Sequence, residues 1–183
     1  LLNALNSYAV AKEIGISDSV VLKALSKYDG AWRRMEYKGQ FGDSMIFDDY
    51  AHHPSEIKAT LFAFKERWPE RPLVCVFQAH QAHRLRALFK EFKTAFKAAD
   101  RIILLPTYVV AGRDRELDKT KTSEALAKMI KSEYLENSKD VPKAVQTVIK
   151  NLGKPAIVVM MGAGDIFTLT PALIKRAPTY VGA

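Results

Sequence analysis

All four histidines of this 183-residue chain lie in two short clusters, and both clusters carry other groups that can do chemistry. His52 and His53 follow one apolar stretch of the sequence, and His80 and His83 follow the next. The same two segments contain further polar side chains: Asp48, Asp49, Tyr50, Gln78, Arg84 and Arg86. Imidazole, carboxylate and guanidinium groups brought together can transfer protons, bind anions or hold a metal ion. The two clusters are therefore the first candidates for a functional site.

The apolar stretches around these clusters predict an α/β fold. Short continuous apolar runs alternate with segments in which apolar residues recur at helical spacing, which is typical of parallel strands joined by crossover helices. The expected strands are 45–49, 73–77, 101–105, 156–161 and a weaker 133–135. The stretch 35–41 and the turn residues Gly42-Asp43 predict one more strand, antiparallel to 45–49. We expect a mostly parallel sheet with one antiparallel edge and helices on both faces.

Such a sheet would bring the two histidine clusters together. Consecutive parallel strands usually lie side by side, and open α/β sheets bind ligands at the C-terminal ends of their strands. We therefore expect the strands 45–49 and 73–77 to be neighbours, with His52 and His80 at one edge. The alternative is that polar groups at strand ends only satisfy loops and helix N-termini, a position that Pro54 suits.

The first 29 residues have a different pattern. Two helical stripes broken at Gly15, with no strand between them, indicate a piece of another domain. We expect residues 1–30 to belong to that domain and residues 31–183 to form the α/β domain, with 30–34 as the linker.

Composition limits the partners and the compartment. The chain has 28 Lys+Arg and 20 Asp+Glu, a net charge of +8, but its cations are scattered along helices, which favours solvated helix faces over a nucleic-acid surface. The longest apolar runs fall far below the ~20 residues that a membrane-spanning helix needs, so no membrane contact is expected. The single cysteine, Cys75, lies inside an apolar run, which indicates a reduced thiol and a cytoplasmic protein.

Two other classes of function remain open from the residues alone. Asp49, His52, His80 and His83 could be the ligands of a metal-dependent hydrolase, although no glutamate lies between His80 and His83 as in the zinc-protease helix motif. A stand-alone nucleotide-binding module is the other class.

Glycine-containing segments near the C-terminus do not predict a nucleotide cradle. Gly162-Ala163-Gly164-Asp165 predicts a tight strand-to-helix turn, since a dinucleotide loop would need a third glycine. Gly153-Lys154 lacks the upstream glycine of a phosphate-binding loop. Thr170-Pro171 predicts the N-terminus of a separate final helix.

The segment Asp48–Pro54 resembles the signature at the start of the C-terminal domain of the Mur ligases. Other stretches add to the resemblance in the same chain order: Leu2-Asn3, residues 30–34, Phe77–His80 followed by Arg84, Arg86 and Phe89, and residues 162–166. As an ordered set covering the whole chain, they resemble the members that attach L-alanine to UDP-N-acetylmuramate. The members that attach a recycled murein peptide to the same sugar nucleotide share the signature, and Phe77–His80 argues against them.

The resemblance implies a three-domain enzyme of peptidoglycan synthesis. Its N-terminal domain would bind the UDP-sugar and its central domain ATP, while residues 31–183 would be the Rossmann-like C-terminal domain and residues 1–30 the last helices of the central one. Such enzymes use ATP and Mg²⁺ to convert the lactyl carboxylate into an acyl phosphate that the amine of L-alanine attacks. This chain alone would be inactive, and no cofactor or metal would bind tightly to it.

Residue by residue, the resemblance also implies roles. Asn3 would lie near the adenine, Arg34 would reach the ATP phosphates and Asp49 would contact the ribose.

Four further residues would bind the substrates: Tyr50, His52, His80 and Arg84. Of these, His52, His80 and Arg84 would be catalytic. His83 stands where the family commonly has a small hydroxyl residue.

Overall fold

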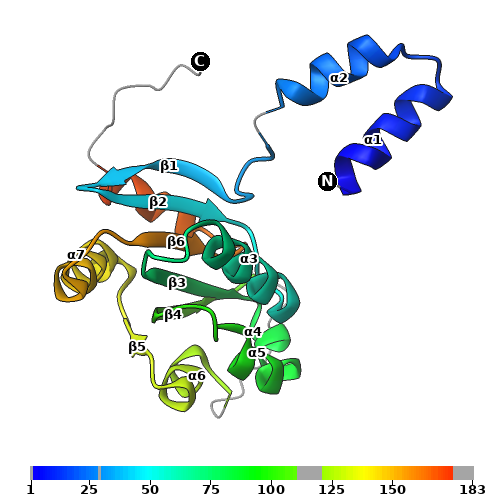
Figure 1. The fold of residues 1–183 in the computed structure, drawn as a ribbon. Helices are drawn as coiled ribbons and strands as arrows, with labels where there is room; N and C mark the ends of the chain where they lie inside the picture. The colour runs from blue at the N-terminus through cyan, green and yellow to red at the C-terminus, as the bar shows by residue number, and fades with distance from the viewer. Residues whose placement is uncertain (1, 29, 111–120, 175–183) are drawn as a thin grey trace. The chain divides into compact units, whose positions relative to one another are not determined.

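The computed structural model describes residues 2–28, 30–110 and 121–174 (Figure 1). The chain divides into two compact units, Leu1–Trp32 and Arg33–Ala183. Each unit is described by itself.

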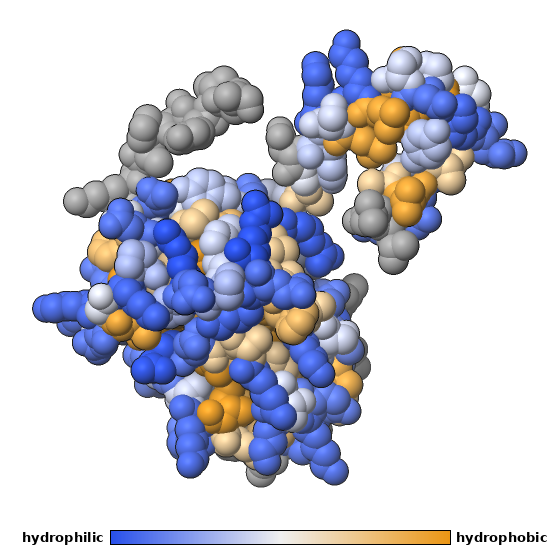
Figure 2. Space-filling view, viewed as in Figure 1, coloured by the Kyte–Doolittle hydropathy of each residue, from blue (hydrophilic) through white to orange (hydrophobic). Residues whose placement is uncertain are grey.

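The first unit is a pair of helices, α1 (Leu2–Glu13) and α2 (Asp18–Ser26), as the break at Gly15 predicts. Gly15 has a φ of +82°, in the left-handed region that glycine adopts without strain. Large aliphatic side chains of the unit are exposed: Leu5, Val10, Ile14, Ile16, Val20 and Leu22. Figure 2 shows apolar surface on these two helices. The assignment of this unit to an ATP-binding domain stays a prediction.

The second unit is built on a six-stranded sheet with the order β1-β2-β6-β3-β4-β5 (Figure 1). Its strands are β1 (Glu36–Phe41), β2 (Ser44–Asp49), β3 (Leu73–His80), β4 (Arg101–Tyr108), β5 (Glu133–Tyr134) and β6 (Ile157–Met161). Only the pair β1 and β2 is antiparallel, and the other neighbours in the sheet are parallel. The predicted α/β class and the antiparallel edge are confirmed.

The expectation that the strands of the two histidine clusters are direct neighbours is wrong. β6 lies between β2 and β3, so that Val159 of β6 pairs with Phe47 on one side and with Cys75 on the other. Each residue of β6 is at most 1% exposed. A strand that is apolar on both faces is most stable in the centre of a sheet, and here that preference outweighs the tendency of consecutive strands to pair.

Helices cover both faces of the sheet. They are α3 (Pro54–Arg67), α4 (Ala82–Ala87), α5 (Phe89–Ala95), α6 (Ser123–Ile130) and α7 (Val141–Leu152), with two 3₁₀ segments, η1 (Ser138–Asp140) and η2 (Ile166–Ala172). One buried cluster joins Cys75 and Phe77 of β3 to α3, α5 and α6, and the other joins Val74 and Val76 to α7 and η2. The alternation along β3 therefore divides the core between the two faces.

Thr170 and Pro171 do not begin a separate helix. Both lie inside η2, and Thr170 is fully buried with its hydroxyl donating to Asp48 at 2.5 Å. The pair Thr170-Pro171 reads the same whether the hydroxyl caps a helix or donates to a buried carboxylate. The sequence alone could therefore not distinguish these two roles.

The thiol of Cys75 is buried at the centre of β3, and burial raises its pKa. In the described ranges, no helix has both the length and the apolar character needed to cross a bilayer.

Replacing Leu61 tests the packing of α3 on the sheet. Leu61 is fully buried in the cluster under α3, so Leu61→Ala should lower the free energy of unfolding by about 2–5 kcal/mol. Urea denaturation measures the change, and Lys58→Ala on the exposed side of the same helix should stay within about 0.5 kcal/mol of the parent. Equal effects of the two substitutions would contradict this packing.

Candidate functional site

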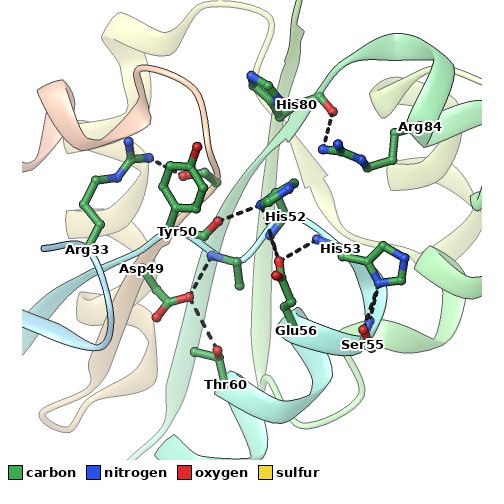
Figure 3. A network of polar contacts seen from close by, with 12 residues as sticks. Arg33, Asp49, Tyr50, His52, His53, Ser55, Glu56, Thr60, His80 and Arg84 are labelled. Atoms are coloured by element: carbon green, nitrogen blue, oxygen red, sulfur yellow. Dashed lines mark hydrogen bonds and ion pairs between the residues drawn. The ribbon is translucent and has the colours of Figure 1, made fainter. Parts of the chain in front are cut away.

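The end of β2 is organised by the carboxylate of Asp49 (Figure 3). It accepts hydrogen bonds from the backbone N–H of Ala51 at 2.8 Å, the backbone N–H of Met35 at 2.8 Å and the hydroxyl of Thr60 at 3.4 Å. Asp49 is 2% exposed. Two of these donors lie on Oδ1 and one on Oδ2, and the contact of Asp49 with a ribose stays a prediction.

The neighbouring carboxylate, Asp48, lies on the other face of the sheet, as the alternation along a strand requires. It is 2% exposed and accepts the hydrogen bond from Thr170 of η2. Burial raises the pKa of Asp48, and the Thr170 hydroxyl opposes that change. Asp48 therefore ties η2 to β2 and does not face the histidines.

The N-terminus of α3 fixes the backbone of the first histidine cluster. His53 is the N-cap residue, and its Nδ1 accepts a hydrogen bond from the backbone N–H of Ser55 at 3.3 Å. The carboxylate of Glu56 accepts from the backbone N–H groups of His52 at 3.0 Å and His53 at 3.2 Å. This reciprocal capping, with Pro54 in the first turn, satisfies the free N–H groups of the helix and leaves the ring of His52 outside it.

The ring of His52 has a defined hydrogen-bond partner. Its Nδ1 lies 3.0 Å from the carbonyl oxygen of Tyr50 and 3.4 Å from the carboxylate of Glu56. Because both neighbours are acceptors, Nδ1 carries the proton, and in the neutral ring Nε2 has the free lone pair.

The two histidine clusters meet at this edge of the sheet. The rings of His52 and His80 are 6.0 Å apart at an angle of 76°, and Tyr50 packs edge-on against His52 at 5.4 Å. On its other side, His80 stacks on Tyr108 of β4 at 5.5 Å and 11°. The imidazoles therefore form a continuous row of rings with two tyrosines.

Glycines after β6 allow this meeting although β6 separates β2 from β3. A Cβ on Gly162 would lie 2.6 Å from the carbonyl oxygen of Gln78, and one on Gly164 would lie 2.7 Å from Cγ of Tyr108. The turn that follows β6 therefore packs directly on the ends of β3 and β4, and residues beyond β2 and β3 contact each other across it.

Within the second histidine cluster, the backbone turns sharply after His80. Gln81 has a φ of +70° and is buried, and its backbone N–H donates to the carbonyl of Tyr108 at 3.0 Å. The reversal starts α4, on which the half-buried Arg84 donates to the carbonyl oxygen of His80 at 3.5 Å. Arg84 thus lies beside His80 in Figure 3, whereas His83 is exposed.

Two arginines lie at the start of the second unit. The guanidinium of Arg34 lies over the ring of Tyr50 at 5.6 Å, and Arg34 is exposed. Arg33 is 2% exposed and donates to the carbonyl oxygen of Gly162. Burial lowers the pKa of Arg33, and the nearby Asp48 and Tyr50 oppose that change. Asn3 lies exposed in the first turn of α1, in the other unit.

Sequence reasoning missed three contributors to the site. Glu56 could have been found, since it lies three residues after the His53 N-cap in the spacing of a capping box. Tyr108 and Arg33 had no comparable signal, because their contacts join segments far apart in the chain.

The predicted metal ligands do not converge. Across the described ranges, no group of three or more His, Cys, Asp or Glu side chains could hold a metal ion. The carboxylate of Asp49 accepts three internal hydrogen bonds, and His83 is exposed. The hydrolase hypothesis therefore lacks its metal centre in this part of the chain.

Comparison with known proteins identifies the family. Residues 33–164 match the family model described as "Mur ligase, glutamate ligase domain". The chain belongs to the Mur ligase family. It is 38% identical over 164 residues to the UDP-N-acetylmuramate–L-alanine ligase of Desulfotalea psychrophila, a match that covers 90% of this chain and 36% of the relative. The chain thus spans little more than a third of the length of that relative.

Solved structures of the family have the same fold. The UDP-N-acetylmuramate–alanine ligase of Thermotoga maritima matches with a TM-score of 0.73 at 23% identity, over 94% of this chain and 36% of that one. A murein peptide ligase of Psychrobacter arcticus matches with a TM-score of 0.59 at 27% identity, over 97% of this chain and 37% of that one. The second unit is thus a Mur ligase domain, and its row of histidine and tyrosine rings lies at the edge of the sheet where β2 and β3 end.

Glu56 should make stability depend on pH. Burial by itself would raise its pKa, but the backbone N–H groups of His52 and His53 outweigh burial and the pKa of Glu56 is lowered. A lowered pKa contributes stability above the ordinary glutamate pKa that is lost as the pH falls through the folded value. The difference in unfolding free energy between the parent and Glu56→Gln should therefore be largest at about pH 7 and become smaller as the pH falls below the ordinary glutamate pKa of about 4.3, as urea denaturation would measure. A difference that does not change with pH would contradict this account.

Proposed function

We propose that this chain is the C-terminal part of a cytoplasmic, ATP-dependent ligase that joins L-alanine to the lactyl carboxylate of UDP-N-acetylmuramate in peptidoglycan synthesis. The observation that carries the proposal is the convergence of His52, His80 and Arg84 at the strand ends of a Mur ligase domain. The curated relative at 38% identity carries that activity in its name. The N-terminal and central domains of the same protein would supply the remaining two thirds, so the chain alone would be inactive.

The first unit supports this reading. Six aliphatic side chains of this unit, from Leu5 to Leu22, are exposed. So much exposed apolar surface on two helices is typical of a surface that packs against another part of a protein. We infer that α1 and α2 pack against the rest of the central ATP-binding domain, in which Asn3 would lie near the adenine.

The residues at the start of the second unit fit part of an ATP site. Arg34 presents an exposed guanidinium, whose planar donor fork suits phosphate oxygens. Asp49 does not fit in the same way, because its carboxylate is 2% exposed and accepts three internal hydrogen bonds. When bound, ATP with Mg²⁺ supplies the phosphoryl group that activates the carboxylate. The phosphate-binding loop itself would belong to the central domain.

His52 would receive a proton from the incoming amino acid. The amine of L-alanine attacks only after it loses a proton, and Nε2 of His52 can accept one, since Nδ1 donates to Tyr50. The ring of His80 packs against the ring of His52 and would help to hold its orientation. Arg84, beside His80, would hold a carboxylate of the substrates and balance negative charge as it develops.

Phosphate release decides between the proposed reaction and its relatives. The polypeptide that carries this chain with its N-terminal and central domains should release phosphate from ATP only when UDP-N-acetylmuramate and L-alanine are both present. Turnover with a murein tripeptide but not with L-alanine would select the recycling ligase instead. No release with either acceptor would refute the ligase function.

Arg84→Ala in that polypeptide should lower turnover by at least about 10-fold, since a charged contact to a developing anion contributes about 1.4 kcal/mol or more. Steady-state phosphate release measures the effect. Arg67→Ala, an exposed arginine in the last turn of α3, is the matched control and should stay close to the parent. Unchanged kinetics of the Arg84 variant would remove Arg84 from the site.

A further inference from the structure

Arg33 is a buried cation that the proposed reaction does not use. It is the first residue of the second unit, and it is 2% exposed. Its guanidinium donates to the carbonyl oxygen of Gly162, in the turn after β6 (Figure 3). A guanidinium loses most of its hydration on burial, so it is stable there only where other groups hold it.

Two aromatic rings hold the same guanidinium. Its carbon lies 4.5 Å from the centre of the Phe167 ring and 5.0 Å from the centre of the Tyr50 ring. Phe167 belongs to η2 and Tyr50 follows β2. Arg33 therefore joins the linker to the ends of two strands and to the last 3₁₀ segment, and a planar cation is the side chain that such packing suits.

The backbone on both sides of Arg34 is in the left-handed region. Arg33 has a φ of +55° and Met35 a φ of +47°, and neither is glycine. Non-glycine residues keep such a conformation only where the surrounding structure holds it.

Three hydrogen bonds hold this turn besides the side chain of Arg33. The backbone N–H of Arg33 donates to Glu36 at 2.9 Å, and that of Met35 donates to Asp49 at 2.8 Å. The carbonyl of Arg33 accepts from the backbone N–H of Tyr50 at 2.7 Å. These bonds fix the backbone conformation of residues 33–35. In this conformation the guanidinium of Arg34 lies over the ring of Tyr50.

We propose that Arg33 is a positioning residue: its buried guanidinium holds the left-handed turn of residues 33–35 and so directs Arg34 toward the ATP phosphates. The second half of this statement rests on the proposed function, and the first half does not. Arg33 itself touches no substrate. It acts through Arg34, in the way that a supporting group orients a binding side chain.

Hydrogen exchange of this chain tests the turn without any activity. In Arg33→Met, which keeps length and apolar contact but removes the charge and the donor fork, the amide of Met35 should exchange at least about 10-fold faster than in the parent. The amides of β3 and β6 should keep their protection, which shows that the sheet is intact. Unchanged exchange at Met35 would overturn the proposal.

Two further variants make the test specific. Arg67→Met removes another guanidinium that lies over a ring, that of Trp68 at 4.9 Å, and should leave the amide of Met35 unchanged. If Arg33→Met unfolds the chain, Arg33→Lys replaces it, since lysine keeps the charge but not the planar group between two rings. Exchange at Met35 should then rise at least about 3-fold, and no change would overturn the proposal.

Kinetics of the polypeptide with all its domains test the direction of Arg34. Arg33→Lys should raise KM for ATP at least about 5-fold while KM for L-alanine stays within about 2-fold, a split that general loss of structure would not produce. Equal changes in both constants would overturn the link to ATP. If the parent polypeptide shows no ATP-dependent ligation, the proposed function fails, and the exchange of Met35 still decides whether Arg33 holds the turn.

Discussion

The burial of β6 between β2 and β3 is the constraint on which the rest of the second unit depends. Its residues are at most 1% exposed and contact both layers of helices, so no other position in the sheet would cover them. That position separates the two strands that carry the histidine clusters. The clusters can meet only because the turn after β6 has glycine at 162 and 164, where a Cβ would clash with β3 and β4. Core packing and site geometry are therefore set by the same segment.

Carboxylates at the end of β2 and at the N-terminus of α3 hold the backbone around the site. Asp49 joins the end of β2 to the linker and to α3, and Glu56 closes the N-terminus of α3 beneath His52. Both satisfy backbone N–H groups that would otherwise be left without partners. Around these carboxylates Arg34 is exposed, and His52, His80 and Arg84 are half-buried, as Glu56 itself is. Asp49 and Glu56 therefore fix the backbone next to Arg34 and at His52.

The sequence predicted the elements of the fold better than their order. The strands, the antiparallel edge and the two separate helices follow from local patterns, which read out burial and backbone preference directly. The place of β6 does not, because it depends on the competition of whole strands for the centre of the sheet. For the site, the meeting of His52 and His80 was predicted, although through the wrong strand order. The internal role of Asp49 was missed, since its bond to Met35 exists only once the 33–35 turn has formed.

The buried thiol of Cys75 gives the sheet a built-in reporter. It sits at the middle of β3, next to β6, and it is the single cysteine of the chain. An alkylating reagent can reach it only in molecules in which the strands of the central sheet have separated. The rate of labelling would therefore report the opening of the central sheet and would not respond to fraying at the surface. Mass spectrometry of the labelled chain would then time those openings without any engineered probe.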